Sequence, residues 1–204
     1  MFHRLVSTIF FVALLLVMPG RDGNTHPHVW IDSYVSIQTQ DDKIQALHIN
    51  WQFDRLFSHV IVADFDLDGD LKLSQYEIGK LIERTSKSMS DFNFFTHVWL
   101  DSKKYPVKSV KNFRVIFEKG RIVYSFIVPF AKPIDPKKTN FAVGLYDDSY
   151  YVDIVMDKND PVRFDGNQPQ NCYYQIKEDK KNSIYSGLVN PLTIFLNCGT
   201  KKNI

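Results

Sequence analysis

The chain has 204 residues, of which 44% are hydrophobic and 24% are charged, enough for one or two domains with a buried core. This composition excludes a disordered, collagen-like or coiled-coil protein. The formal net charge is only +2 and no basic patch is visible, so the sequence argues against nucleic-acid binding. Aromatic residues make up 14% of the chain, a richness typical of β-strands.

Residues 1–25 predict a cleaved signal peptide rather than a part of the fold. A basic start precedes an apolar run at 5–17, and small and polar residues follow it. This run is shorter than the roughly 20 apolar residues that a membrane span needs. We therefore expect cleavage just before His26, although no Ala-x-Ala site is present, and a periplasmic protein of residues 26–204 without an integral membrane segment.

The rest of the chain has mostly the period-two pattern of β-strands. In chain order, hairpins are expected at 28–53 and 113–128, and further strands at 95–100, 141–145, 150–156, 172–176 and 192–196. Two helices are expected, at 54–63 and at 74–89, the second behind the N-cap candidate Ser74 with Glu77 three residues later. The prediction is a single α+β domain, mainly antiparallel and sandwich-like, with an EF-hand-like helix–loop–helix insertion at about 54–90.

The segment between the two expected helices has the spacing of a calcium loop. Counted from Asp66 as position 1, the loop offers carboxylates from Asp66, Asp68 and Asp70, the Lys72 carbonyl, the Ser74 hydroxyl and the Glu77 carboxylate at position 12. Calcium prefers such a set of oxygen ligands. Leu71 stands at position 6, where the turn favours glycine, so we expect an affinity of about 0.1–1 mM.

Two alternatives to this register remain open. Counting from Asp64 places Gly69 at position 6, but it puts Gln75 at position 12 and so removes the bidentate carboxylate. The segment is also compatible with a solvated acidic turn that binds no ion.

A second candidate metal site directly follows the expected cleavage point. His26 and His28 are one residue apart in an extended X-Pro segment, so their imidazoles point to the same side. Imidazole nitrogen suits zinc or copper. Two histidines make a weak site, and we expect a third ligand from the new terminal amine of His26 or from a carboxylate such as Asp153.

Cys172 and Cys198 are the only cysteines. An even number of cysteines in an exported chain predicts a disulfide. In the chain-entropy model it would stabilise the fold by about 3.5 kcal/mol. The alternative, a two-thiolate metal site, lacks a CxxC pair.

Several short motifs, taken in order, resemble a bacterial domain family of unknown function. They comprise His26-Pro-His-Val-Trp-Ile-Asp32, Trp51-Gln-Phe-Asp54, Asp66-Leu-Asp-Gly-Asp70, Phe94-Phe-Thr96, Tyr146-Asp-Asp-Ser-Tyr150-Tyr151 and the two late cysteines. That family is described as the periplasmic component of an uncharacterised ABC-type transport system, with a signal peptide before the histidine pair and genes often near transition-metal transporters. The resemblance therefore implies a transition metal at His26 and His28 and a membrane metal transporter as partner.

The sequence carries no recognisable catalytic motif: no nucleophile elbow, HExxH helix or phosphate loop is present. His48, His59 and His97 are expected to be ordinary surface or hydrogen-bonded histidines. We expect a non-enzymatic periplasmic protein that binds zinc or a similar ion and is braced by calcium. The alternative is a structural or partner-binding β-module of the cell envelope. A conventional two-lobed substrate receptor is not expected, because no alternating βαβ units are visible.

Overall fold

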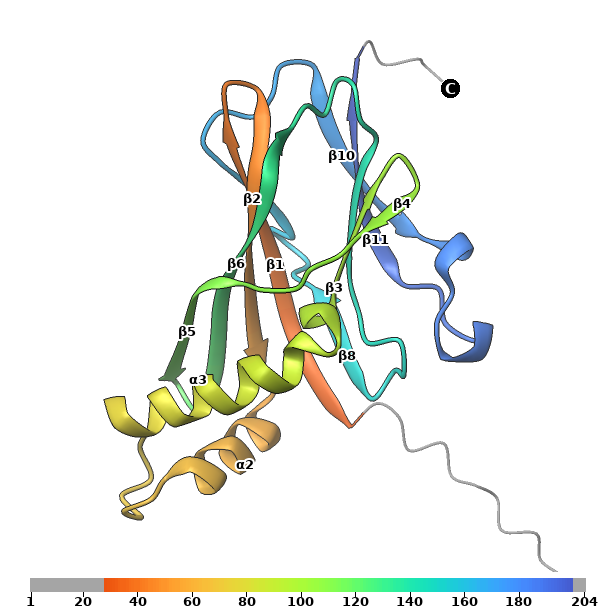
Figure 1. The fold of residues 1–204 in the computed structure, drawn as a ribbon. Coiled ribbons are helices and arrows are strands. Elements are labelled where there is room, and N and C mark those ends of the chain that lie inside the picture. Colours follow the sequence, from red (N-terminus) through yellow and green to blue (C-terminus); the bar gives the residue numbers. More distant parts are fainter. Residues whose placement is uncertain (1–27, 200–204) are drawn as a thin grey trace, which may run out of the picture.

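The computed structural model describes residues 28–199, and it contains two β-sheets and a pair of helices (Figure 1). The expected signal peptide and His26 lie outside these residues. The first sheet has the strand order β5-β6-β2-β1-β8, with β9 also paired to β1. The second has the order β10-β11-β7-β3-β4. No helix within residues 28–199 is long and apolar enough to cross a membrane.

Most strand pairs are antiparallel, as predicted, and both expected hairpins are present. The strands of the first sheet are β1 (Val29–Gln40), β2 (Lys43–Phe53), β5 (Lys111–Glu118), β6 (Arg121–Ile134), β8 (Val152–Met156) and β9 (Val162–Asp165). Those of the second are β3 (Thr96–Leu100), β4 (Lys103–Tyr105), β7 (Phe141–Leu145), β10 (Cys172–Glu178) and β11 (Leu192–Cys198). Asp41 and Asp42 join β1 to β2 with φ of 52° and 59°, the backbone that a tight hairpin turn requires.

One sheet feature goes beyond the predicted hairpins. β8 and β9 both run parallel to β1, with Trp30 opposite Asp153 and Val35 opposite Val162. The strand predicted at 150–156 therefore lies beside the first strand of the domain. Because of this pairing, the start of β1 and the turn before β8 meet at one end of the sheet.

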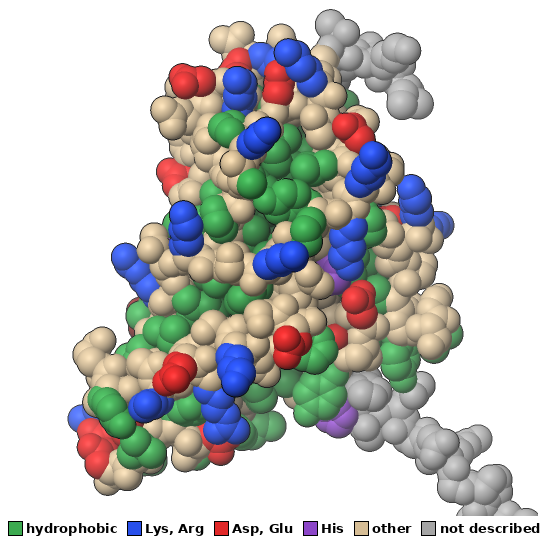
Figure 2. Space-filling view, in the orientation of Figure 1, with side chains coloured by type: hydrophobic (Ala, Val, Ile, Leu, Met, Phe, Trp, Pro, Cys, Tyr) green, Lys and Arg blue, Asp and Glu red, His purple; other side chains and the backbone are tan. Residues whose placement is uncertain are grey.

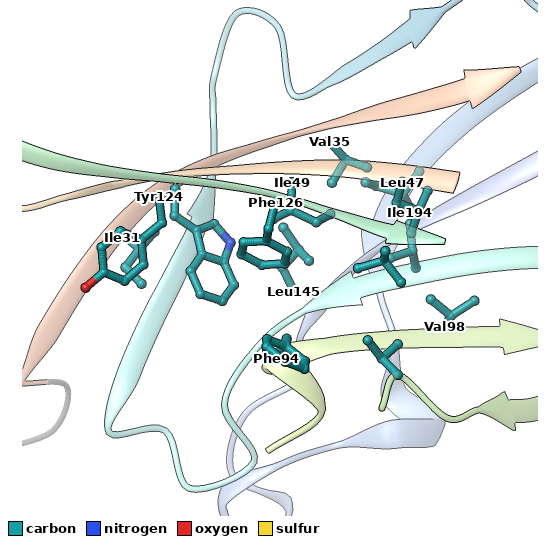
Figure 3. Close-up of a cluster of buried hydrophobic side chains, with 14 of the residues drawn as sticks. Ile31, Val35, Leu47, Ile49, Phe94, Val98, Tyr124, Phe126, Leu145 and Ile194 are labelled. Carbon is teal, nitrogen blue, oxygen red and sulfur yellow. The ribbon is translucent and has the colours of Figure 1, made fainter. Parts of the chain in front are cut away.

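The inner faces of the two sheets share one hydrophobic core. Alternate residues of β1 and β2 point inward, among them Ile31, Val35, Leu47 and Ile49, all 2% exposed or less. Figure 3 shows them with Phe126 on one side of the cluster and with Leu145, Val98 and Ile194 of the second sheet on the other. The period-two pattern in the sequence is thus the pattern of core burial.

The helix pair covers one end of the first sheet. α2 (Arg55–Phe65) begins at Asp54, whose Oδ1 accepts a hydrogen bond from the Phe57 N–H at 2.9 Å. α3 (Gln75–Ser90) begins at Ser74, which forms the predicted capping box with Glu77. α3 extends across the ends of β5 and β6 in Figure 1. The acidic loop joins the two helices at their outer end.

The C-terminal part contains the predicted disulfide. Cys172 and Cys198 lie opposite each other in β10 and β11 and are bonded. A disulfide is compatible with an exported protein. Three short 3₁₀ turns, η1 (Asn93–Phe95), η2 (Lys180–Asn182) and η3 (Tyr185–Gly187), complete the fold. Asp179 caps η2 by accepting hydrogen bonds from the N–H groups of Lys181 and Asn182.

Candidate metal centre

Three carboxylates of the α2–α3 loop converge as the Asp66 register predicts. One oxygen from each of Asp66, Asp68 and Asp70 lies within 4.8 Å of the other two. Within residues 28–199 this is the only group of three or more His, Cys, Asp or Glu side chains close enough to share an ion. Carboxylate oxygens in such a cluster suit a hard divalent cation.

The Asp66 carboxylate accepts hydrogen bonds from three backbone N–H groups of the loop. Its Oδ1 accepts hydrogen bonds from the N–H groups of Gly69 at 2.8 Å and Asp70 at 3.1 Å, and its Oδ2 accepts one from Leu71 at 2.8 Å. Gly69 and Leu71 both have positive φ, 76° and 62°. Leu71 therefore adopts the left-handed conformation that position 6 requires, at a cost of about 1–2 kcal/mol for a residue with a Cβ atom. Its side chain is 74% exposed and gains no packing in return.

The fourth carboxylate, that of Glu77 in α3, links the end of the loop to its beginning through hydrogen bonds. Its Oε1 accepts a hydrogen bond from the Leu67 N–H at 2.6 Å, and its Oε2 accepts bonds from both the N–H and the hydroxyl of Ser74 at 2.7 Å. These bonds, those from Ser74 first, lower the pKa of Glu77 and keep it ionised. To bind calcium through both oxygens, Glu77 would have to give up at least some of these hydrogen bonds.

The loop concentrates negative charge. The Asp70 N–H bond by itself lowers the pKa of Asp68, but the charges of Asp70 and Glu77, together with burial, raise it overall. Repulsion among carboxylates that are held close together is relieved when a cation binds between them. The loop therefore holds three carboxylates whose mutual repulsion a bound cation would relieve.

The second candidate site is only partly described. His28 is exposed at the start of β1, where its ring stacks on that of Tyr151 with centroids 4.8 Å apart. Asp153 follows Tyr151 by two residues on the neighbouring strand β8, so it lies on the same face of the sheet as His28. Burial raises the pKa of Asp153. No group of three metal-binding side chains forms around His28 in the described part of the chain, and His26 lies outside it.

Other carboxylates near this end have structural partners. Asp147 is buried and accepts hydrogen bonds from the N–H groups of Ser149, Tyr151 and Val152, so it is a turn former. Asp32 forms an ion pair with Arg121 at 2.7 Å. Asp153, opposite Trp30 on β8, remains the carboxylate expected as a third ligand.

The burial of His97 was not predicted from the sequence. The His97 ring is 2% exposed and stacks on Tyr146 with centroids 3.8 Å apart. Its Nε2 donates a hydrogen bond to the Tyr146 carbonyl at 2.9 Å, whereas its buried Nδ1 has no hydrogen-bond partner among residues 28–199. Burial, helped by the Lys104 charge, lowers the pKa of His97 to about 4, so the ring is neutral at physiological pH. The stacked Tyr146 ring, which lies 49 residues away in sequence, contributes to this burial.

Comparison with known proteins points to a family without an assigned activity. The sequence profile of the family described as "Protein of unknown function (DUF1007)" matches residues 10–194. An uncharacterized 15.5 kDa protein from the trpE 3' region of Spirochaeta aurantia is 30% identical over 136 residues, which are 67% of this chain and 96% of that protein. An uncharacterized protein of Haemophilus influenzae is 23% identical over 167 residues, 79% of this chain and 78% of its own length.

Proposed function

The chain belongs to the DUF1007 family, and from its acidic loop and histidine pair we propose that it is an exported, periplasmic metal-binding protein that serves transition-metal transport. In this proposal the Asp66–Glu77 loop holds a calcium ion that braces the helix pair. His26 and His28 bind zinc or a neighbouring transition metal. The partner is a membrane metal transporter, and the chain itself catalyses no reaction.

The convergence of Asp66, Asp68 and Asp70 supports this proposal most strongly. Their spacing predicts an ion-binding loop, and the folded chain places their oxygens together. When Asp66 is counted as position 1, its carboxylate accepts hydrogen bonds from the N–H groups at positions 4, 5 and 6. The Glu77 carboxylate accepts one from the N–H group at position 2. These contacts favour the Asp66 register over the Asp64 register.

The two proposed sites differ in ligand chemistry and hence in metal. The loop offers only oxygen, which suits calcium, whereas the histidine pair offers nitrogen, which suits zinc or copper. His28 directly precedes β1, whereas the acidic loop joins α2 to α3, so the two sites use separate residues. A calcium ion would thus brace the fold while the histidine site carries the transported metal.

A zinc titration of the processed protein by calorimetry tests the histidine site. The double variant His26→Ala/His28→Ala should bind zinc at least about tenfold more weakly, a loss of 1.4 kcal/mol or more. His59→Ala is the matched control, because His59 is exposed on α2 and hydrogen-bonds only to the Arg55 carbonyl. Equal zinc affinity in the wild type and the double variant would leave the structural or partner-binding module as the better description.

Two further forms identify the third ligand. A form with extra residues before His26 should bind zinc less tightly if the terminal amine is a ligand. Asp153→Asn should weaken zinc binding instead if the carboxylate is the ligand. Zinc affinity that neither change alters would contradict the proposed three-ligand site.

A further inference from the structure

A pocket of about 310 Å³ lies between the helix pair and the inner face of the first sheet. Its walls are mainly apolar, with large side chains from both helices and from β1 and β2: Ile31, Phe53, Phe57, Ile61, Leu81 and Met89. None of the proposed metal ligands that fall within residues 28–199 lines it. A pocket of this volume and lining has the character of a small-molecule site.

The mouth of the pocket exposes large apolar side chains to water. Val60 and Tyr151 line the pocket and are 47% and 48% exposed, and Leu56, one helical turn before Val60, is 78% exposed. Figure 2 shows hydrophobic side chains at the surface along the helix pair. An apolar rim that continues into an apolar pocket indicates a surface to which an apolar group binds.

Two opposite charges also line this pocket. Asp64 lies in the last turn of α2 and Arg84 lies in α3, and both are exposed. Neither takes part in an ion pair within the described residues; the Arg84 guanidinium lies over the Phe65 ring at 5.5 Å instead. A cation and an anion that line one apolar pocket, and that form no ion pair within residues 28–199, complement a head group that carries both charges.

We propose that this pocket binds a single-chain zwitterionic amphiphile of the lysophospholipid class. The acyl chain occupies the apolar interior between the helices and the sheet. The phosphate meets the Arg84 guanidinium, whose paired donors match its oxygens, and the ammonium group meets the Asp64 carboxylate. This activity uses none of the proposed metal ligands and is independent of the proposed metal transport.

The direct test is titration of the processed protein with a 12-carbon lysophosphatidylethanolamine below its critical micelle concentration. Binding is followed by calorimetry and by tryptophan fluorescence, because Trp51 lines the pocket and is only 1% exposed. Ser88 is exposed and lines the pocket, so Ser88→Trp should block the pocket and weaken binding at least about tenfold. Lys87→Trp, an equally large change at an exposed neighbour outside the pocket, should stay within about twofold.

A second probe, dodecanoate, tests the assignment of the head group. Asp64→Asn should change the affinities for the two probes in opposite directions. Asp64→Asn should weaken lysophosphatidylethanolamine binding about threefold, because the ammonium loses its partner, and strengthen dodecanoate binding about threefold, because a like charge is removed. Arg84→Gln should weaken the binding of both probes. Glu83→Gln, on the same helix but outside the pocket, should alter neither. All titrations are run at one fixed calcium concentration, so that the occupancy of the loop is the same for every variant.

Three results would overturn the proposal. The first is the absence of saturable binding, or equal binding by Ser88→Trp that melts like the wild type. The second is binding to phosphatidylethanolamine vesicles that Ser88→Trp leaves unchanged, which would assign the rim to a membrane surface. The third is a dimer in sedimentation analysis that Ser88→Trp dissociates, which would make a second copy of the chain the occupant.

Discussion

Gly144 in β7 leaves no room for a side chain, because the Tyr146 ring lies over it. A Cβ atom at this position would lie 2.6 Å from Tyr146 Cε1 and 3.1 Å from Thr193 Oγ1. The same Tyr146 ring stacks on His97, so it cannot shift without losing that contact. The packing of the Tyr146 ring against Gly144 and His97 therefore requires a glycine at position 144.

Gly144→Ala should therefore lower the free energy of unfolding by about 1–3 kcal/mol, as overpacking does in a filled site. Gly79→Ala is the matched control: Gly79 lies in α3 with nothing within 4 Å of an added Cβ. There the same change should raise stability by up to about 1 kcal/mol through helix propensity. Urea melts of the two variants measure both effects, and a destabilisation of equal size at the two positions would contradict this account.

His97 makes stability depend on pH. Its pKa is about 4 in the folded chain and 6.5 in its ordinary state, since burial disfavours the charged ring; Lys104 lowers the pKa further, while Asp147 and Asp148 oppose this. The unfolded chain therefore binds the extra proton first as pH falls. The resulting stability is fully present above about pH 6.5 and is lost progressively down to about pH 4, on the order of 3 kcal/mol in all.

The test compares unfolding free energies between pH 7 and pH 4. His97→Phe keeps a ring against Tyr146 but cannot titrate, so its stability should fall much less over this range than that of the wild type. His59→Phe, at an exposed site, should keep the wild-type slope. Parallel slopes in wild type and His97→Phe would show that His97 does not carry the dependence.

At the scale of the elements, the helix–loop–helix unit was readable from sequence because its signals are local. Ser74 and Glu77 cap a helix through contacts only three residues apart, and the carboxylate spacing follows from the turn itself. The side chain of Glu77 completes the capping box, and in the proposed Asp66 register it also occupies position 12 of the loop. The register can therefore be tested at two positions.

Glu77→Gln should abolish calcium-dependent stabilisation, because an amide cannot replace the bidentate carboxylate, while glutamine still completes the capping box. Gln75→Glu should leave calcium binding unchanged, since position 75 is not a ligand in the Asp66 register. Melting temperatures with and without 5 mM calcium decide between the registers. A gain of calcium response in Gln75→Glu would favour the Asp64 register instead.

The β10–β11 pair depends on a covalent link as well as on its ladder. The Cys172–Cys198 bond closes a loop with a sequence separation of 26 residues. In the chain-entropy model, its loss should lower the free energy of unfolding by about 3.5 kcal/mol. Urea melts of the oxidised protein and of Cys172→Ala/Cys198→Ala measure this difference, and equal midpoints would show that the ladder alone holds the two strands.

At the scale of the whole molecule, the sequence predicted strands and hairpins far better than their assembly. The two hairpins and most strand positions follow from alternation and turn residues, which act over a few positions. The parallel pairing of β8 and β9 with β1 joins segments more than 100 residues apart, and no local pattern specifies it. β4 and β9 were not predicted either, because three or four residues with polar members give too short a pattern.

In the candidate sites, too, the features within one continuous segment were predictable and those that join distant segments were not. The acidic loop is one continuous segment, so its spacing predicted the convergence of Asp66, Asp68 and Asp70. The stacking of His28 on Tyr151, the approach of Asp153 and the burial of His97 all depend on strands distant in sequence. The apolar pocket depends on how the helix pair meets the sheet, which no single segment encodes.

Calcium binding by the folded chain is measured by equilibrium dialysis of the processed protein against 5 mM calcium. At the expected dissociation constant of about 0.1–1 mM, one calcium ion should bind per chain. Asp66→Asn should bind none, and Asp64→Asn, the first position of the rejected register, should still bind one. No bound calcium in the wild type, or one ion retained by Asp66→Asn, would contradict the account.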